Sequence, residues 1–225
     1  TDAVAFAAEL EARQKDLGQF GRVATIPLLN EDATKARILG TLWQLAGGGG
    51  GAASPEGPAD SAGAPTASDG IPAAEPEDCI ALFFAGHGLA FGERFYLVPH
   101  DVGYEGKTLE MEGADLERVL AHAVSDAELE EALVRIGAGR LLLVVDACHS
   151  GQALESEERR RGPMNAKGLA QLAYEKGMYV LAASQAYQKA VETADLGHGF
   201  LTYALVEEGL KTDAADRAPR EGEVR

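Results

Sequence analysis

Hydrophobic residues recur along the chain with two different periods, which predict helices and strands in turn. Phe6 and Leu10 stand four apart in "TDAVAFAAELEARQKDLG", and Ile38, Leu42 and Leu45 fall on one face of a second helix. Between them "RVATIPLL" is expected to form a short strand, and Asn30 is expected to cap the second helix.

The second half of the chain alternates buried-type strands with helices. The expected strands are Cys79–Ala85, 94–99, Arg140–Val145 and "MYVLAAS" at 178–184, and the expected helices follow a Ser125–Glu128 capping box and occupy 169–176 and 200–210. A polar loop is expected through Gly113. Because the main strands are apolar at nearly every position, we predict an α/β fold with a mostly parallel central sheet and helices on both faces.

Two segments break this pattern. Residues 46–78 hold five of the nine prolines, five consecutive glycines and no aromatic residue, which predicts a disordered insertion. Residues 155–168 ("ESEERRRGPMNAKG") form a basic linker. The rest, across 1–225, is predicted to be one domain. Its first helix begins at Thr1 and it stops at "REGEVR", where a strand could begin, so we expect a fragment truncated at both ends.

The charge and the composition of the chain restrict the kinds of molecule that it could bind. With 36 acidic against 20 basic residues the net charge is −16, which disfavours nucleic acid and anionic membranes as partners. Two cysteines provide neither a disulfide framework nor a four-thiolate zinc site. The apolar runs are too short to cross a bilayer, and no signal peptide is visible. We expect a monomeric cytoplasmic protein, with further domains fused to it in a longer chain.

Chemically capable side chains follow two of the predicted strands. His87 comes after the strand Cys79–Ala85, and Cys148 comes after Arg140–Val145. In open α/β sheets ligands bind beyond the carboxyl ends of the strands, so an imidazole and a thiol are predicted to share one edge. A cysteine nucleophile needs such a neighbouring base. Gly88 could donate its N–H to an oxyanion.

Plainer interpretations exist for each residue taken singly. Cysteine is among the most buried residue types, and a histidine between glycines is usually local structure. His149 is a rival base, but as the next residue it should point away from Cys148. His198 stands at a helix start, where we interpret it as structural or as part of the rim. The pairing of His87 with Cys148 makes the catalytic interpretation the more specific one.

"FFAGHG" together with "VVDACHSG" resembles the caspase-like cysteine peptidases of clan CD and peptidase family C14, specifically metacaspases and bacterial orthocaspases. "YLVP", "AASQ" and "GHGFLTYAL" extend the resemblance over nearly the whole chain. It implies the caspase-like fold, whose first strand would precede Thr1. It also implies a protein or peptide substrate and no required cofactor.

The resemblance also assigns roles to individual residues. Cys148 matches the nucleophile, His87 the general base and acid, and Gly88 an oxyanion donor. Asp146 matches the acid of the primary specificity pocket, and Asp2 a second pocket acid whose plainer interpretation is a helix cap. Acids at these positions imply cleavage after Arg or Lys.

The chain departs from the family pattern at several positions. Ala85 replaces a pocket serine that many metacaspases have. Calcium activation is left open, because only Asp126 and Glu155 could correspond to the family's acidic cluster, and both have the plainer interpretation of surface charges. The basic linker resembles the segment where such enzymes cleave themselves, which makes candidates of Arg159, Arg160, Arg161 and Lys167.

Two alternative functions remain. Within enzymes, a legumain-like or gingipain-like peptidase of different specificity would share the His-Gly and Cys arrangement. In another class, the domain would be a catalytically silent scaffold or partner-binding module.

Overall fold

A computed structural model describes residues 1–48, 71–91, 94–103, 113–149, 173–174, 176–183 and 197–212. Its strands form one mixed sheet in the order β3-β2-β1-β4-β5. The strands are β1 (Cys79–Phe91), β2 (Arg94–Val98), β3 (Val124–Ser125), β4 (Arg140–His149) and β5 (Tyr179–Ala182). β1, β4 and β5 are parallel, whereas β2 runs antiparallel to both β1 and β3.

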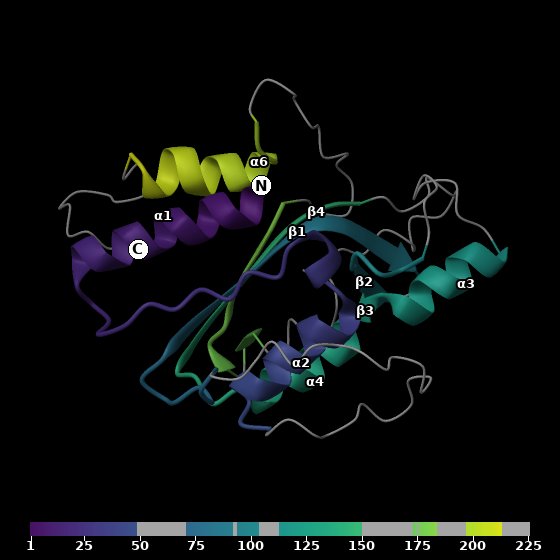
Figure 1. The fold of residues 1–225 in the computed structure, drawn as a ribbon, viewed down its shortest axis with the longest axis horizontal. Coiled ribbons are helices and arrows are strands. Elements are labelled where there is room, and N and C mark those ends of the chain that lie inside the picture. Colours follow the sequence, from purple (N-terminus) through teal and green to yellow (C-terminus); the bar gives the residue numbers. More distant parts are fainter. Residues whose placement is uncertain are drawn as a thin grey trace.

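Helices cover both faces of this sheet (Figure 1). One face carries α1 (Asp2–Leu17) and α6 (Phe200–Tyr203), which continues as the π-helix η5 (Ala204–Leu210). The other face carries α2 (Lys35–Leu45) and α4 (Asp126–Arg135). The predicted α/β architecture is confirmed.

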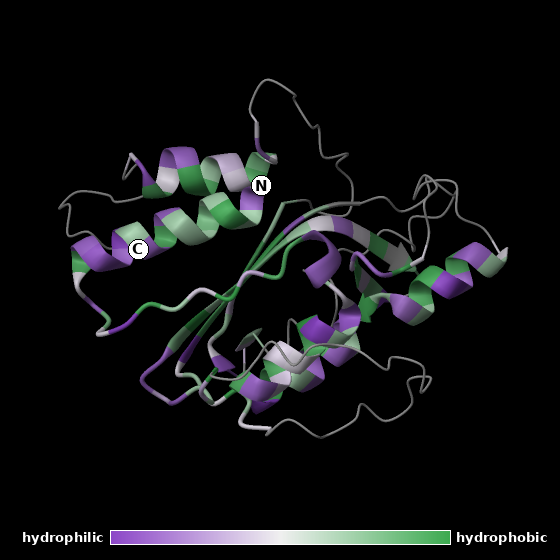
Figure 2. Cartoon of the chain, in the orientation of Figure 1, coloured by the Kyte–Doolittle hydropathy of each residue, from purple (hydrophilic) through white to green (hydrophobic). Residues whose placement is uncertain are grey.

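The apolar run in β4 follows from this double cover. Leu143 and Val145 belong to the core beneath α2 and α4, whereas Val144 packs with Phe6 of α1 and Val206 of η5. Successive strand residues point to opposite faces, so a strand covered on both sides must be apolar at every position. The middle parts of the strands are accordingly hydrophobic in Figure 2.

Local signals fix several helix ends as predicted. Gly18 closes α1 in the left-handed conformation, and Ser125 with Glu128 forms the capping box of α4. The expected cap of α2 was wrong: Asn30 begins a short 3₁₀ turn, and the Thr34 side chain accepts from the Arg37 N–H instead. Asn30 can take the left-handed φ of 50° that this turn requires.

The structure corrects three further element predictions. Residues 22–29 are not a strand in the described part of the chain, because extended backbone becomes a strand only when it pairs with a neighbour. A helix that was not predicted, α3 (Gly113–His122), buries Val119 against Leu89 and Val102. The strands β1 and β4 each run beyond the predicted Ala85 and Val145, through the chemically capable residues.

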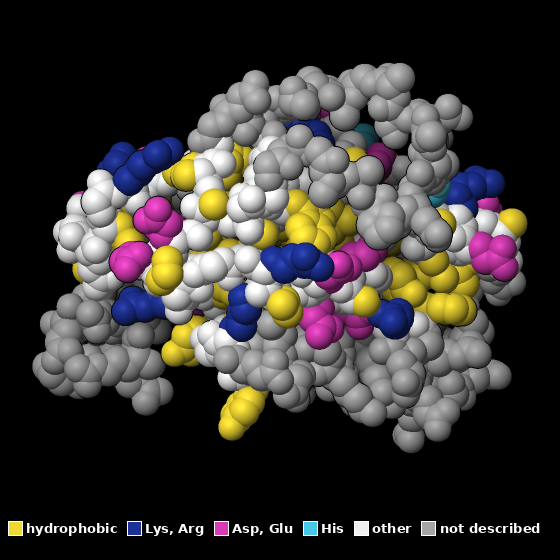
Figure 3. Space-filling view, turned by 90° about the horizontal axis from the view of Figure 1, so that it is seen from below, with side chains coloured by type: hydrophobic (Ala, Val, Ile, Leu, Met, Phe, Trp, Pro, Cys, Tyr) yellow, Lys and Arg dark blue, Asp and Glu magenta, His cyan; other side chains and the backbone are white. Residues whose placement is uncertain are grey.

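Seen from below, acidic and basic side chains alternate with hydrophobic ones over the side where α2 and α4 lie (Figure 3). The acidic excess is therefore not gathered into one patch on this face. Among the described helices, none has the length and apolar character needed to cross a membrane. Most of the predicted insertion 46–78, and all of the linker 155–168, lie outside the described residues.

Candidate active site

The parallel pairing of β1 with β4 brings the two predicted catalytic residues together. His87 is the direct Cα partner of Cys148, and Ala85 is the partner of Asp146 two residues earlier. Paired Cα atoms on neighbouring strands lie about 5 Å apart. The backbone therefore places His87 and Cys148 side by side. The Cys148 side chain lies outside what the structure describes.

Strand alternation assigns these positions to one face of the sheet. Phe83 and Val144 are register partners that pack in the core beneath α1 and η5. His87 lies four residues beyond Phe83, and Asp146 two beyond Val144, so both occupy positions on that face. His87 is exposed there.

A hollow of about 2000 Å³ runs along β1 and is lined from both faces of the sheet, by residues such as Phe6 on the α1 side and Leu42 on the α2 side. Its lining includes Asp2, His87, Asp146 and His198, which come from four separate parts of the chain. The predicted base and both predicted pocket acids are thus all among the residues that line this hollow.

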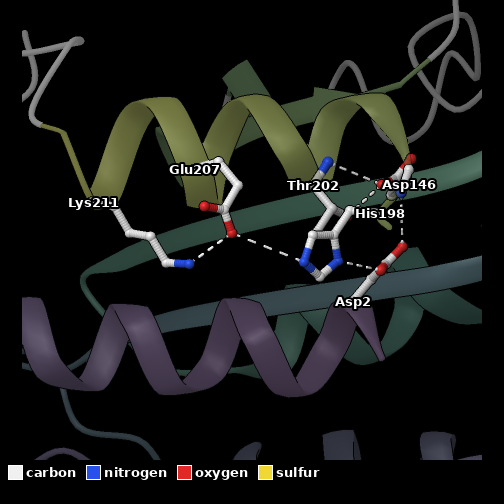
Figure 4. Close-up of polar contacts among 7 residues, drawn as sticks. Asp2, Asp146, His198, Thr202, Glu207 and Lys211 are labelled. Atoms are coloured by element: carbon white, nitrogen blue, oxygen red, sulfur yellow. Dashed lines mark hydrogen bonds and ion pairs between the residues drawn. The ribbon is translucent and has the colours of Figure 1, made fainter. Parts of the chain in front are cut away.

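Asp146 is held by the first turn of α6. Its Oδ2 accepts a hydrogen bond from the Thr202 backbone N–H at 3.0 Å and a second one from the Thr202 hydroxyl. Thr202 is fully buried, while Asp146 is half-buried. Figure 4 shows the two residues beside each other. Both bonds use one carboxylate oxygen, and neither occupies Oδ1.

Asp2, near the start of the sequence, contacts His198 and Gly199, which directly precede α6. Its Oδ1 lies 2.8 Å from Nδ1 of His198, and its Oδ2 accepts from the Gly199 N–H at 3.2 Å. Because a carboxylate can only accept, Nδ1 carries the hydrogen of this contact. The plainer interpretation of Asp2 as a helix cap is wrong, since Thr1 occupies that position.

Gly199 separates the two acids. A Cβ atom on Gly199 would lie only 2.5 Å from Oδ2 of Asp146, closer than side-chain atoms approach one another. On its other side the Gly199 N–H binds Asp2. The Gly199 φ of −60° is open to any residue, so the backbone conformation does not require glycine. Glycine is required because a side chain at this position would collide with Asp146.

Gly88 lies within β1, where it pairs with Leu97 and His149. A Cβ atom there would lie 2.8 Å from the Phe95 ring, so glycine allows β1 and β2 to pack closely. The strand expected to end at Ala85 continues through His87 and Gly88 to Phe91. The oxyanion role of Gly88 stays a prediction.

Other titratable residues lie apart from this face or are engaged elsewhere. Cys79 is the partner of Arg140 at the far end of the β1–β4 pair, and burial raises the pKa of its thiol despite that arginine. Asp126 is not a surface charge: it is 9 % exposed, and its Oδ1 lies 3.2 Å from Nη1 of Arg94. No group of three or more metal-ligating side chains occurs in the described ranges, which exclude Glu155.

Comparison with known protein families supports the resemblance that the sequence motifs indicated. Residues 71–216, well over half of the chain, match the model of the caspase domain, peptidase family C14. The chain belongs to the caspase domain family. No curated protein and no solved structure matches it. As a family C14 domain it belongs to a family of cysteine peptidases, whose substrates are proteins.

Sequence reasoning missed the part played by residues 198–202 in this caspase domain. The sequence predicts a structural or rim position for His198 and no role for Gly199 or Thr202. The paired glycines around His198 were the available signal, because glycines flanking a polar residue often mark close backbone approach. Thr202 gave no signal, since a buried threonine in a helix is ordinary.

Proposed function

We propose that this caspase domain is a cysteine endopeptidase that cleaves peptide bonds after Arg or Lys. The observation that carries the proposal is the register of β1 and β4, which pairs His87 with Cys148 two residues beyond Asp146. A base beside the thiol and an acid on the same strand are what cleavage after a basic residue needs.

The proposed reaction has two stages. The Cys148 thiolate attacks the scissile carbonyl carbon, and His87 protonates the leaving amine as the carbon–nitrogen bond breaks. Water, deprotonated by His87, then attacks the thioester carbonyl, which releases the acid product and regenerates the thiol. Asp146 binds the guanidinium or ammonium group of the substrate residue before the cut, with Asp2 as the second acid of the pocket.

Self-processing would follow from this specificity. The basic residues Arg159, Arg160, Arg161 and Lys167 stand between β4 and β5 in the sequence. An enzyme selective for basic residues would find suitable sequence there. Calcium activation and a cytoplasmic location are further proposals, and calcium enters the test below.

A panel of fluorogenic peptides tests the function. The peptides differ only in the residue before the cut, which is Arg, Lys, Asp or Asn, and each is assayed with calcium and with a chelator. We expect cleavage after Arg and Lys alone. Cleavage after Asn would favour a legumain-like peptidase, and cleavage after Asp would overturn the pocket assignment. A protein that cleaves none of them would favour the silent scaffold.

A further inference from the structure

Asp146 is held by an unusual pair of donors that belong to one residue. Thr202 gives both its backbone N–H and its hydroxyl to the same oxygen, Oδ2. A hydrogen bond to a charged group is stronger than one between neutral groups. This pair fixes which carboxylate oxygen faces the helix and which, Oδ1, is turned away from Thr202.

The Thr202 side chain is held in place by its surroundings. It is fully buried, and its hydroxyl donates a hydrogen bond to Asp146 Oδ2. The helix that carries it is anchored through Val206, which is 1 % exposed and packs with Phe6 and Val144. The hydroxyl therefore has one fixed location relative to β4.

Gly199 also restricts the orientation of the Asp146 carboxylate. Its position leaves no room for a side chain beside Asp146, so the carboxylate lies directly against the backbone of the turn. Thr202 and Gly199 together leave the carboxylate little freedom to rotate. Its orientation is set by α6 and not by the strand that carries it.

We propose that Thr202 is a positioning residue that sets selectivity for a basic side chain, by aiming Asp146 Oδ1 into the specificity pocket. This inference rests on the proposed function, since it concerns the same pocket. A basic substrate side chain binds most tightly to an acid that is already oriented, because the acid then loses no rotational freedom on binding.

Substitution of Thr202 tests the inference with two matched peptides. One has arginine before the cut, and the other has citrulline, which has nearly the same shape but no charge. Thr202→Val removes only the hydroxyl, whereas Thr202→Ser retains it. We expect Thr202→Val to lower the arginine-to-citrulline ratio of kcat/KM roughly tenfold, and Thr202→Ser to stay within about threefold of wild type.

The ratio separates positioning from general damage to the fold. A purely structural role for Thr202 would lower kcat/KM for both peptides equally and leave the ratio unchanged, which would overturn the inference. Asp146→Asn provides a second criterion: once the charge is gone, adding Thr202→Val should not change the ratio further. Independent, additive effects of the two substitutions would also overturn it.

Two outcomes distinguish this inference from the proposed function. If the wild-type protein cleaves neither peptide, the proposed function fails and the inference falls with it. If the wild type prefers arginine and Thr202→Val does so equally, only the inference fails. Should Thr202→Val not fold, Thr202→Cys takes its place, because a thiol of similar size is a weaker donor, and an intermediate loss of the ratio is then expected.

Discussion

His87 and Cys148 are direct partners across the parallel strands β1 and β4, although 60 residues separate them in the chain. The pairing is part of a continuous register that begins at Cys79 and Arg140. A shift by one residue would move either position to the opposite face of the sheet. The relative placement of the two residues is therefore determined by the whole strand pair.

The two cysteines provide a matched test of the nucleophile. We expect Cys148→Ala to lower peptide cleavage by about a thousandfold or more, because no other thiol stands beside His87. Cys79→Ala should retain full activity, since Cys79 lies at the opposite end of the strand pair. Steady-state kinetics measure both, and equal loss in the two variants would contradict the assignment.

Asp146 should control the preference for a basic residue. Asp146→Asn keeps the size of the side chain and removes its charge, so kcat/KM for an arginine peptide should fall about a hundredfold while citrulline cleavage changes little. Glu207→Gln is the control, since it removes one charge from the helix that holds the pocket and contacts His198 only at 3.9 Å. A similar loss in both variants would point to a general charge effect.

The close approach of Gly199 to Asp146 predicts an unusually severe effect of one methyl group. Gly199→Ala should displace the carboxylate and lower cleavage after arginine about a hundredfold. Gly40, within α2, has open space around the position of a Cβ atom. Gly40→Ala should leave activity unchanged and raise the free energy of unfolding by about 0.5–1 kcal/mol. Normal activity in Gly199→Ala would refute this packing argument.

The capping box of α4 predicts a pH dependence of stability. Burial opposes ionisation of Glu128, but hydrogen bonds from Lys35 and Ser125 outweigh it and lower the pKa below its ordinary value of 4.5. Ionised Glu128 therefore stabilises the fold fully above pH 4.5, the pKa of the unfolded chain. This stabilisation is lost as the pH falls through the lower pKa that Glu128 has in the folded state.

Urea unfolding of Glu128→Gln between pH 7 and pH 3 measures this effect. The variant should be about 1 kcal/mol less stable than wild type at neutral pH, and the difference should shrink at acid pH. Glu131→Gln is the control on the same helix, because its side chain is 58 % exposed and pairs with Arg135 four residues on. A constant difference at every pH would argue against the role of Glu128 ionisation.

Self-cleavage in the basic linker is the last expectation to test. Purified wild-type protein should divide into two fragments, with new ends after Arg159, Arg160, Arg161 or Lys167, while Cys148→Ala stays intact. Mass spectrometry identifies the ends. Wild-type protein that remains whole under conditions where it cleaves arginine peptides would contradict the expectation.

The sheet and the pairing of His87 with Cys148 could be predicted because both depend on strong local signals. The apolar run Leu141–Val145 requires cover on both faces, and the residues after it follow from the strand direction. The Ser125–Glu128 box and Gly18 are likewise signals within a few residues. The capping box and the helix end could be predicted because their partners are adjacent in the chain, whereas His87 and Cys148 follow from the common edge at which neighbouring strands end.

Features that depend on distant partners could not be predicted in the same way. Residues 22–29 have the composition of a strand, but strand formation needs a neighbouring edge. The ion pair of Asp126 with Arg94 joins two elements, and in it the acid expected at the surface is buried while the arginine is exposed. The contacts of Thr202 with Asp146 and of His198 with Asp2 join residues far apart in sequence.

These distant contacts have a consequence for biosynthesis. The strands that place His87 beside Cys148 are complete once residue 149 has left the ribosome. The two pocket acids, in contrast, obtain their partners only from residues 198–202. The strands that carry His87 and Cys148 are therefore synthesised before residues 198–202, which contact Asp2 and Asp146.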